Sequence, residues 1–425
     1  MVKKPFYGWV IVGLAFLVMV LYEIEYVFGI FMDPLIAQFG WSREAMSWTV
    51  SIAYGLGIFM GIYWGKFLDK HGPRKLFAIA CGVGGLGLFL SSFISQLWQL
   101  YLTFGVMWGV GWSSFFGIPN AVVRKWFVRR AGLALGIAVC GIALGWPVLF
   151  PLVEHLIASG SWQHTFRVLG VIVWVIGAVV VAFIKPSPEA IGSCPDGEKP
   201  EAASQGSSTG KSFSAEVEGW TAGKAVRTRG FWMTWLSLFC LIMALTMIIF
   251  HAPSYAKAQG LEPTAVAFIF GVMGLLSVLG RIGSGRLGDH LITRGVPAVH
   301  ARRCMYAISG LLMGIGAIIM LQVASTSLLW VWAVVFGIGY GFHVPQLAAV
   351  IGDLFGRKNI GLILSLGGTA AGLAGIIGPP LAGRIYDIQG SYALAFQIAA
   401  GICFLAIIFS LLIKGTALET GANTG

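Results

Sequence analysis

Long apolar stretches constrain this 425-residue chain more than any other feature. Twelve of them are each long enough to cross a bilayer as a helix of ~20 residues. They lie near residues 9–32, 47–67, 76–95, 98–123, 131–153, 165–184, 231–256, 264–285, 304–321, 328–352, 360–383 and 392–413. Only 11% of the residues are charged, which excludes a water-soluble enzyme, and the unbroken runs exclude an outer-membrane β-barrel. The sequence therefore predicts an all-α polytopic membrane protein.

The twelve stretches fall into two groups of six. Residues 1–184 form the predicted N-terminal six-helix bundle, and residues 230–425 form the C-terminal one with a short tail. Between them, residues 185–229 are rich in Pro, Ser, Gly, Glu and Lys, which is typical of a flexible linker. We expect Ala202–Ser212 to lack order.

The distribution of basic residues predicts the orientation in the membrane. With the N-terminus in the cytoplasm, 23 of the 28 Lys and Arg lie on the cytoplasmic side and four lie outside. The remaining one, Arg281, lies inside a span. Because Lys and Arg accumulate in cytoplasmic loops, we expect both termini and the linker to be cytoplasmic, in the inner (cytoplasmic) membrane. The net charge of +11 then needs no nucleic-acid partner to explain it.

The two halves repeat each other. Residues 65–70 match residues 285–290 at an offset of 220, and the Gly-x-Gly to Phe-x-Arg pattern of 109–129 recurs at 337–357, 228 residues later. Residues 160–162 match 390–392 at an offset of 230. Three matches in order indicate a duplicated six-helix unit, an arrangement that places a solute path between the halves near the bilayer midplane.

These motifs also resemble a known family. The segment Gly65–Lys75 is similar to the signature loop of the major facilitator superfamily, with a degenerate second copy from Gly285 to Asp289. Tyr7–Trp9 and Lys125–Gly136 resemble the two signatures of the monocarboxylate transporter family, and the bacterial oxalate/formate antiporters share much of this pattern. The resemblance covers essentially the whole chain. It implies two pseudo-symmetric six-helix bundles and transport by alternating access.

Charged residues near the predicted cytoplasmic helix ends are candidates for gating. Asp69, Arg74 and Asp289 belong to the two signature loops. A carboxylate there can pair with Arg or Lys and accept hydrogen bonds from a neighbouring helix N-terminus. Such latches would hold the inside closed, although the same charges could simply set the topology.

Arg281 is the strongest candidate for substrate binding. An intramembrane charge is costly and usually faces a bundle interior or an aqueous cavity. The planar guanidinium of arginine matches a carboxylate, and the resemblance implies that an arginine in span eight receives the substrate carboxylate. A structural ion pair with Glu23 or Glu25 is the alternative.

Glu25 and Glu23 are the candidates for proton coupling. The resemblance implies an aspartate four residues before the arginine and a lysine in span one, but this chain has Ser277 and Tyr26 at those positions. On an α-helix Tyr22, Glu25, Tyr26 and Gly29 lie on one face, and Tyr26 occupies the position expected to face the cavity, which favours Glu25 over Glu23. Because an apolar site favours the neutral carboxyl and a nearby arginine the charged one, substrate arrival at Arg281 could free the carboxylate to take a proton. The alternative is that Glu25 or Glu23 only faces the extracellular funnel.

Several other side chains are weaker candidates for the substrate site. His251, beside Ala252-Pro253 in a span that we expect to be broken, could bind a substrate oxygen, transfer a proton or simply pack. Asn120 follows Pro119 and could donate a hydrogen bond. The aromatic walls and gates would come from Tyr26, Phe28, Phe31, Phe116, Tyr340, Phe342 and His343.

The leading functional hypothesis is symport of a proton with a small monocarboxylate, of the lactate or pyruvate type. An oxalate/formate-type exchanger is the runner-up, disfavoured because residues 360–383 contain no Lys or Arg as a second cation. A non-transporting nutrient sensor is a third possibility. The six cysteines lack the spacing of a metal site or disulfide framework, and we expect no metal, no cofactor and no enzymatic activity. We expect a monomer, since this is the default for the fold.

Overall fold

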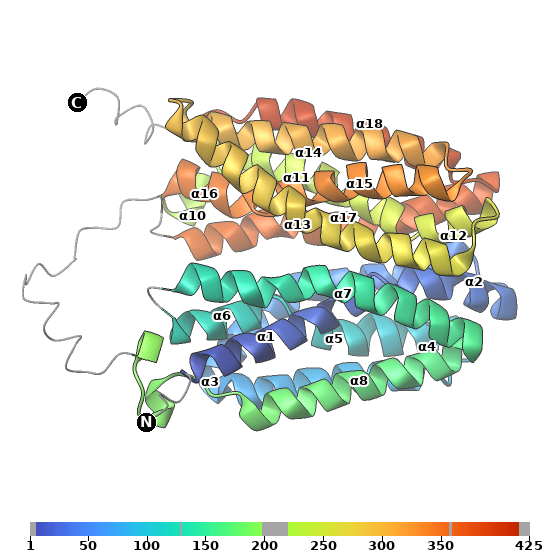
Figure 1. Cartoon of the computed structure of the whole chain (residues 1–425), viewed down its shortest axis with the longest axis horizontal. Coiled ribbons are helices and arrows are strands. Elements are labelled where there is room, and N and C mark those ends of the chain that lie inside the picture. The colour runs from blue at the N-terminus through green and yellow to red at the C-terminus, as the bar shows by residue number, and fades with distance from the viewer. Residues whose placement is uncertain (1–5, 128–129, 198–219, 357–358, 416–425) are drawn as a thin grey trace, which may run out of the picture. The chain divides into compact units, whose positions relative to one another are not determined.

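The structure is a computed structural model that describes residues 6–127, 130–197, 220–356 and 359–415. Within these ranges the regular elements are helices, drawn in Figure 1, so the all-α prediction is confirmed. The centre of the predicted linker, with Ala202–Ser212, and residues 416–425 of the tail lie outside the described residues.

The chain divides into two compact units. Unit 1 comprises Met1–Trp41 and Trp48–Phe213, and unit 2 comprises Ser42–Ser47 and Ser214–Gly425. The boundary between Phe213 and Ser214 falls inside the predicted linker. The short segment Ser42–Ser47, which the sequence places in the first half, clusters with unit 2.

Unit 1 contains the first group of helices. They are α1 (Gly8–Tyr22), η1 (Glu23–Glu25), α2 (Phe28–Phe39), α3 (Arg43–Ser91), α4 (Leu97–Leu100), η2 (Tyr101–Trp108), α5 (Gly109–Trp112), α6 (Gly117–Trp126), α7 (Ala131–Ser159), α8 (Trp162–Phe183), η3 (Glu189–Ile191) and η4 (Pro195–Gly197). Helix α1 packs against α6, α7 and α8, and most of its buried residues are apolar.

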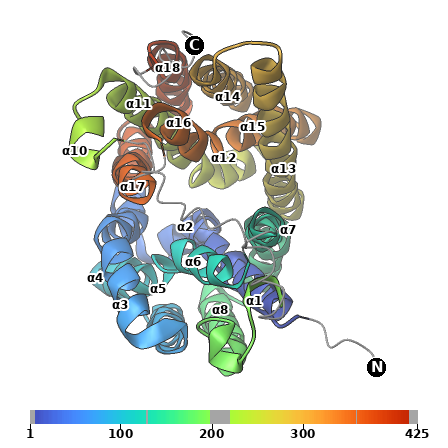
Figure 2. The same cartoon turned by 90° about the vertical axis from the view of Figure 1, so that its left-hand side faces the viewer.

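Unit 2 contains the second group. Its helices are α10 (Ala222–Ala225), α11 (Arg229–Ile249), α12 (Ala252–Ala258), α13 (Pro263–Thr293), α14 (Ala298–Leu321), α15 (Thr326–His343), α16 (Gln346–Phe355), α17 (Ile360–Gln389) and α18 (Ala393–Leu411). Helix α15 packs between α13 and α14, while α11 packs against α17 and α18 (Figure 2).

Ten helices of the described residues are long and apolar enough to cross a membrane. The two remaining predicted spans are also helical. Residues 47–67 lie in α3, which Gly72 breaks at a φ of 78°, a left-handed value that glycine adopts without steric cost. Residues 98–123 are divided among α4, η2, α5 and α6. Interrupted helices are tolerated at membrane depth where neighbouring protein satisfies the freed backbone groups.

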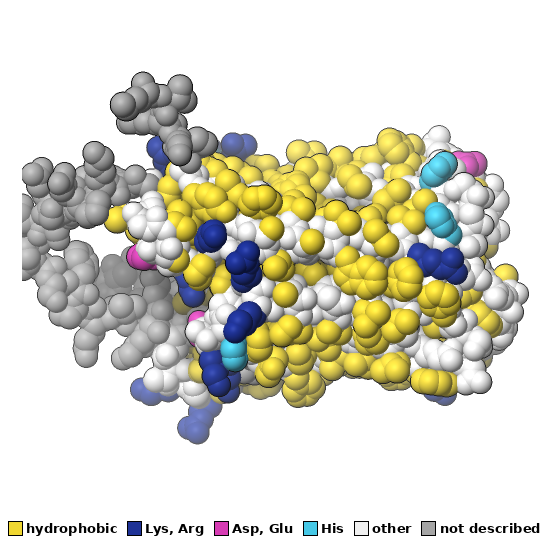
Figure 3. Space-filling view, turned by 90° about the horizontal axis from the view of Figure 1, so that it is seen from below, with side chains coloured by type: hydrophobic (Ala, Val, Ile, Leu, Met, Phe, Trp, Pro, Cys, Tyr) yellow, Lys and Arg dark blue, Asp and Glu magenta, His cyan; other side chains and the backbone are white. Residues whose placement is uncertain are grey.

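Apolar side chains are exposed along the sides of the helices. Phe59 is 74% exposed, and Leu133 and Leu279 are each 59% exposed. In the face drawn in Figure 3, hydrophobic side chains cover the middle of the helices, and Lys and Arg gather toward their ends. A lipid-facing surface has this pattern, because the hydrocarbon core accepts apolar side chains and excludes charges.

Candidate functional site

The first helix of unit 1 is interrupted where the sequence places its two glutamates. Helix α1 ends at Tyr22, the 3₁₀ turn η1 spans Glu23–Glu25, and α2 begins at Phe28. Both carboxyls are buried, with Glu23 1% and Glu25 0% exposed. Because a 3₁₀ turn has about three residues per turn, side chains two positions apart point in different directions. The two glutamates therefore reach different neighbouring helices.

Each glutamate receives a hydrogen bond from a tryptophan. Trp108, the last residue of the π-helix η2, donates its indole N–H to Oε2 of Glu25 at 2.7 Å. Trp146 in α7 donates to Oε2 of Glu23. Sequence reasoning missed both indoles. The available signal was weak: a tryptophan in an apolar span usually needs a partner for its N–H, but the sequence does not say which.

Within unit 1, aromatic rings pack around the interrupted segment. Tyr26 is 6% exposed, packs on Trp146 with ring centroids 5.3 Å apart, and accepts a hydrogen bond from the Tyr54 hydroxyl at 3.3 Å. Tyr22 stacks on Trp112, whose indole donates to the Tyr22 carbonyl at 3.0 Å. Tyr26 thus lies beside the predicted proton-coupling residues, as its place next to Glu25 implies.

The other candidates in unit 1 are not all gathered at one place. Phe28 and Phe31 are buried in the interior of the unit, where they pack on Phe104 and Phe166. Phe116 is 46% exposed at the break before α6. The side-chain N–H₂ of Asn120 donates a hydrogen bond to the Phe116 carbonyl at 2.9 Å. Their roles as substrate contacts remain predictions.

In unit 2, Arg281 meets Tyr340 across two closely packed helices. The guanidinium carbon of Arg281 lies 5.7 Å from the centre of the Tyr340 ring, within the range of a cation–π contact. The Nε of Arg281 is buried and has no hydrogen-bond partner among the described residues. Helices α13 and α15 approach closely here because Gly341 faces the Ser277 carbonyl, where any side chain would collide with the backbone.

His343 lies beside this pair. Its side chain is 2% exposed, its ring centroid is 5.5 Å from that of Tyr340, and Nδ1 is 3.4 Å from the Ser309 hydroxyl. The Phe342 ring lies near Gly283 of α13. The structure therefore brings together three of the predicted substrate residues in unit 2, Arg281, Tyr340 and His343.

His251 occupies the interruption between α11 and α12 and is fully buried. Its Nε2 is 2.9 Å from the Pro379 carbonyl, and its Nδ1 is 3.0 Å from the Tyr392 hydroxyl. Because a carbonyl oxygen only accepts, Nε2 donates and Nδ1 accepts from the tyrosine. The imidazole is thus engaged on both sides within unit 2. Its proposed contact with substrate or protons stays a prediction.

A second set of contacts in unit 2 holds the first turn of α3. The Asp387 carboxylate accepts hydrogen bonds from the backbone N–H groups of Arg43 at 3.0 Å and Glu44 at 2.8 Å. The Arg43 guanidinium lies over the Tyr386 ring at 4.5 Å. A carboxylate is stabilised at a helix N-terminus by the free N–H groups and the helix dipole. Sequence reasoning missed Asp387, since its partners are more than 340 residues away.

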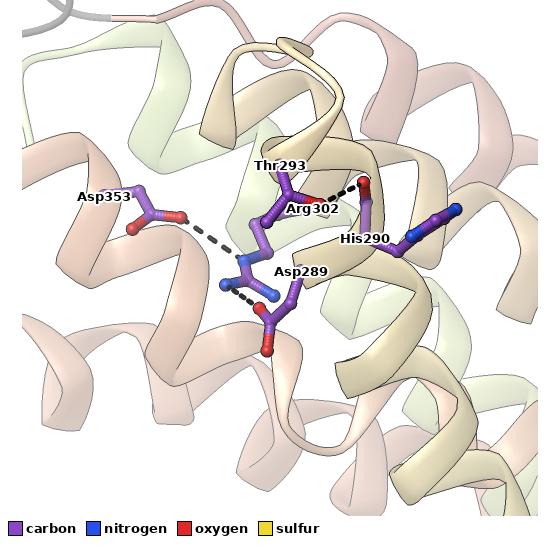
Figure 4. Close-up of polar contacts among 5 residues, drawn as sticks. All are labelled: Asp289, His290, Thr293, Arg302 and Asp353. Atoms are coloured by element: carbon purple, nitrogen blue, oxygen red, sulfur yellow. Dashed lines mark hydrogen bonds and ion pairs between the residues drawn. The ribbon is translucent and has the colours of Figure 1, made fainter.

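The predicted gating residues also have partners. In unit 2, Arg302 donates to Asp289 at 2.9 Å and to Asp353 at 3.4 Å (Figure 4). In unit 1, Asp69 lies 4.0 Å from Lys125, and Arg74 donates to the carbonyls of residues 181 and 182 at the end of α8. Arg302 and Asp353 were not among the sequence candidates.

The described residues contain no cluster of three or more His, Cys, Asp or Glu side chains that could hold a metal ion. The six cysteines are free thiols.

Comparison with known families identifies the fold. A family model described as Major Facilitator Superfamily matches residues 14–301 and 298–424. The chain belongs to this superfamily. This confirms the predicted fold class, which is that of two six-helix bundles. It also confirms the resemblance to the major facilitator superfamily that the sequence motifs indicated.

Curated members of the superfamily align over most of the chain. Monocarboxylate transporter 13 of Rattus norvegicus is 27% identical over 408 residues, covering 92% of this chain and 86% of that protein. Monocarboxylate transporter 2 of Homo sapiens is 25% identical over 420 residues, covering 96% and 85%. This superfamily member is thus a multi-pass membrane protein similar to the monocarboxylate transporters.

Solved structures support the fold alone. A bacterial homologue of the human lysosomal transporter Spinster, crystallised in an inward-facing and unoccupied conformation, matches with a TM-score of 0.73 at 16% identity, covering 98% of this chain and all of that one. The E. coli xylose transporter XylE, in a partially occluded inward-open conformation, matches with a TM-score of 0.70 at 12% identity, covering 96% and 100%.

Proposed function

We propose that this protein is a secondary transporter that moves a small monocarboxylate, of the lactate or pyruvate type, together with a proton by alternating access. The observation that supports this most is Arg281. It is a permanent cation on a membrane-spanning helix, its buried Nε lacks a hydrogen-bond partner among the described residues, and Tyr340 lies beneath its guanidinium. A bound carboxylate would supply the missing acceptor and neutralise the charge. The names of the aligned relatives agree with this substrate class.

The proton would be taken by a buried carboxyl in unit 1. Glu25 and Glu23 lie on one turn, and burial favours the neutral, protonated form of a carboxyl, which carries a proton without placing a charge in the membrane. An anion and a proton moving together make the step electroneutral. A pH gradient of one unit then supplies about 1.4 kcal/mol, which corresponds to tenfold accumulation.

Uptake by reconstituted liposomes tests the proposal. We expect labelled lactate to accumulate when the lumen is alkaline relative to the bath, and only to equilibrate when the gradient is collapsed. Arg281→Gln should abolish uptake. Arg294→Gln, at the exposed end of the same helix, is the matched control and should retain it. Unchanged uptake by Arg281→Gln would contradict the assigned anion site.

The same liposomes separate proton symport from exchange. We expect Glu25→Gln to retain passive equilibration but to lose gradient-driven accumulation, with Glu23→Gln as the parallel variant. If wild-type protein shows no gradient-driven uptake but takes up labelled formate when oxalate is preloaded, the oxalate/formate-type exchanger replaces the symporter.

The proposal includes an orientation and a state of assembly. Both termini and the linker would face the cytoplasm, a prediction that protease cleavage of an epitope added at residue 425 in sealed inside-out vesicles would test. Transport by a single chain would be tested by mixing wild-type and Arg281→Gln protein. Activity proportional to the wild-type fraction is expected of a monomer, whereas a disproportionate loss would indicate coupled protomers.

A further inference from the structure

Two departures from regular α-helical geometry and one helix proline meet at the glutamates of unit 1. The turn that contains them, η1, is a 3₁₀ turn. Trp108 ends the π-helix η2, and Trp146 is followed in α7 by Pro147, which cannot donate a backbone hydrogen bond. π-Helical segments are rare and are frequently found at functional sites. The 3₁₀ turn, the π-helix and the proline belong to three different helical segments. Their meeting at the same two carboxyls points to a site that depends on all three segments.

The two indoles that contact the glutamates are hydrogen-bond donors only. An indole N–H can donate but not accept, so it can bond either a carboxylate or the carbonyl oxygen of a protonated carboxyl. An arginine or lysine in the same place would instead favour the ionised form strongly. For Glu25, Trp108 is the side-chain hydrogen-bond partner found in the described residues, while its Oε1 is buried without one. The indole therefore fixes orientation and leaves the second oxygen for a proton.

The packing around each indole holds it in place. Trp108 is fully buried and contacts Phe104 and Phe115. Trp146 is 1% exposed and stacks on Phe150, and the absence of a side chain at Gly145 lets α7 approach the Glu23 side chain closely. Among the described residues of unit 1, the phenols of Tyr22, Tyr26 and Tyr54 also lie in this region.

We propose that Trp108 and Trp146 are positioning residues of a two-carboxyl proton site, holding Glu25 and Glu23 respectively in fixed orientations as the proton arrives and leaves. This rests on the proposed proton-coupled transport. The two carboxyls reach different helices, so each indole acts on the carboxyl that it contacts.

Replacement of each tryptophan by phenylalanine tests the assignment, because it retains an aromatic ring and removes the N–H. Trp332→Phe is the matched control: Trp332 is fully buried, and its indole N–H has no hydrogen-bond partner in the described residues. We expect Trp108→Phe and Trp146→Phe each to displace the midpoint of the pH profile of lactate uptake by about one pH unit, a tenfold change in proton affinity. The control should keep the wild-type midpoint.

A second measurement does not depend on transport. Infrared difference spectra of the purified protein between acid and neutral pH should contain a carbonyl stretching band from protonated Glu23 or Glu25, assigned by its loss in Glu23→Gln or Glu25→Gln. Each Trp→Phe variant should move this band, since a hydrogen bond to a carboxyl changes its stretching frequency, and Trp332→Phe should not. An unmoved band and an unmoved midpoint in both variants would overturn the inference. A moved band in a protein without lactate uptake would instead retain the positioning role and reject the proposed function.

Discussion

The two signature loops occupy corresponding places in units 1 and 2 but are held differently. They share one feature: Arg74 in unit 1 donates to backbone carbonyls at the end of α8, and Arg303 in unit 2 donates to backbone carbonyls at the end of α18. They differ at one pair of corresponding positions, Lys125 in unit 1 and Asp353 in unit 2. These two residues are 228 positions apart, which is the offset between the two copies in this region. The charge at that position is reversed.

The reversal changes the kind of contact that each loop makes. In unit 1, Lys125 faces Asp69 directly at 4.0 Å, and the two side chains are 47% and 80% exposed. In unit 2, Asp289 and Asp353 are both acidic, so Arg302 bridges them, with a side chain only 15% exposed (Figure 4). Exposed pairs contribute little to stability, whereas a shielded arginine between two carboxylates contributes more. We infer that the loop of unit 2 is the firmly held one.

The largest expected effect follows from removing the bridge. Arg302→Gln leaves two carboxylates without their shared cation, and we expect it to lower the free energy of unfolding by about 2 kcal/mol. Denaturant unfolding in detergent measures this loss. Arg294→Gln, in the same loop region but exposed, should change stability little. Equal effects of the two variants would contradict the comparison.

A charge exchange sharpens the comparison further. Adding Asp353→Lys to Arg302→Gln gives unit 2 the arrangement of unit 1, with a lysine facing Asp289. We expect this double variant to recover about 1 kcal/mol of the loss, since one ion pair is restored. Asp353→Lys alone should be destabilising, because it places two cations together. No recovery in the double variant would show that the two loops are not equivalent.

Unit 1 should respond much less to the corresponding change. We expect Lys125→Gln to lower the free energy of unfolding by less than about 0.5 kcal/mol, because the pair with Asp69 is exposed and screened by salt. The difference between wild type and variant should vanish in high salt. A loss as large as that of Arg302→Gln would mean that exposure does not explain the contrast.

The smallest effect concerns two helix N-termini that are also related by the repeat. Ser42 accepts a hydrogen bond from the Ala45 N–H before α3, and Glu262, 220 residues later, caps α13. Hydrogen bonds from the Thr264 side chain and from the backbone N–H groups of Ala265 and Thr264 lower the pKa of Glu262 below its ordinary value. The corresponding cap at Ser42 does not ionise in this range.

A lowered pKa in the folded state has a defined consequence for stability. The contribution of Glu262 is present above the pKa of the unfolded chain, near 4.3, and is lost as the pH falls through the folded value. We therefore expect the stability difference between wild type and Glu262→Gln to shrink from neutral pH toward pH 3. The difference for Ser42→Ala should stay constant over the same range. A pH-independent Glu262→Gln difference would contradict the ionised cap.

Much of the architecture could be predicted because it depends on local pattern. The apolar stretches, the repeat and the lone intramembrane arginine are properties of the sequence itself, and the helices, the superfamily and the position of Arg281 on α13 agree with them. Burial of Glu23 and Glu25 also follows, since they lie inside an apolar span. An α-helical face could not reveal the 3₁₀ turn that directs these two side chains apart.

The partners of these residues could not be predicted in the same way. Trp108 and Trp146 lie 83 and 123 residues from the glutamates that they contact, and Arg302 lies 51 residues from Asp353. The sequence by itself determined that the chain crosses the membrane repeatedly, that its halves are related, and where rare charges enter the apolar spans, because hydrophobic transfer acts on each segment separately. Only the tertiary structure decided which donor meets which carboxyl, because hydrogen bonds and ion pairs depend on distances between helices that local pattern does not specify.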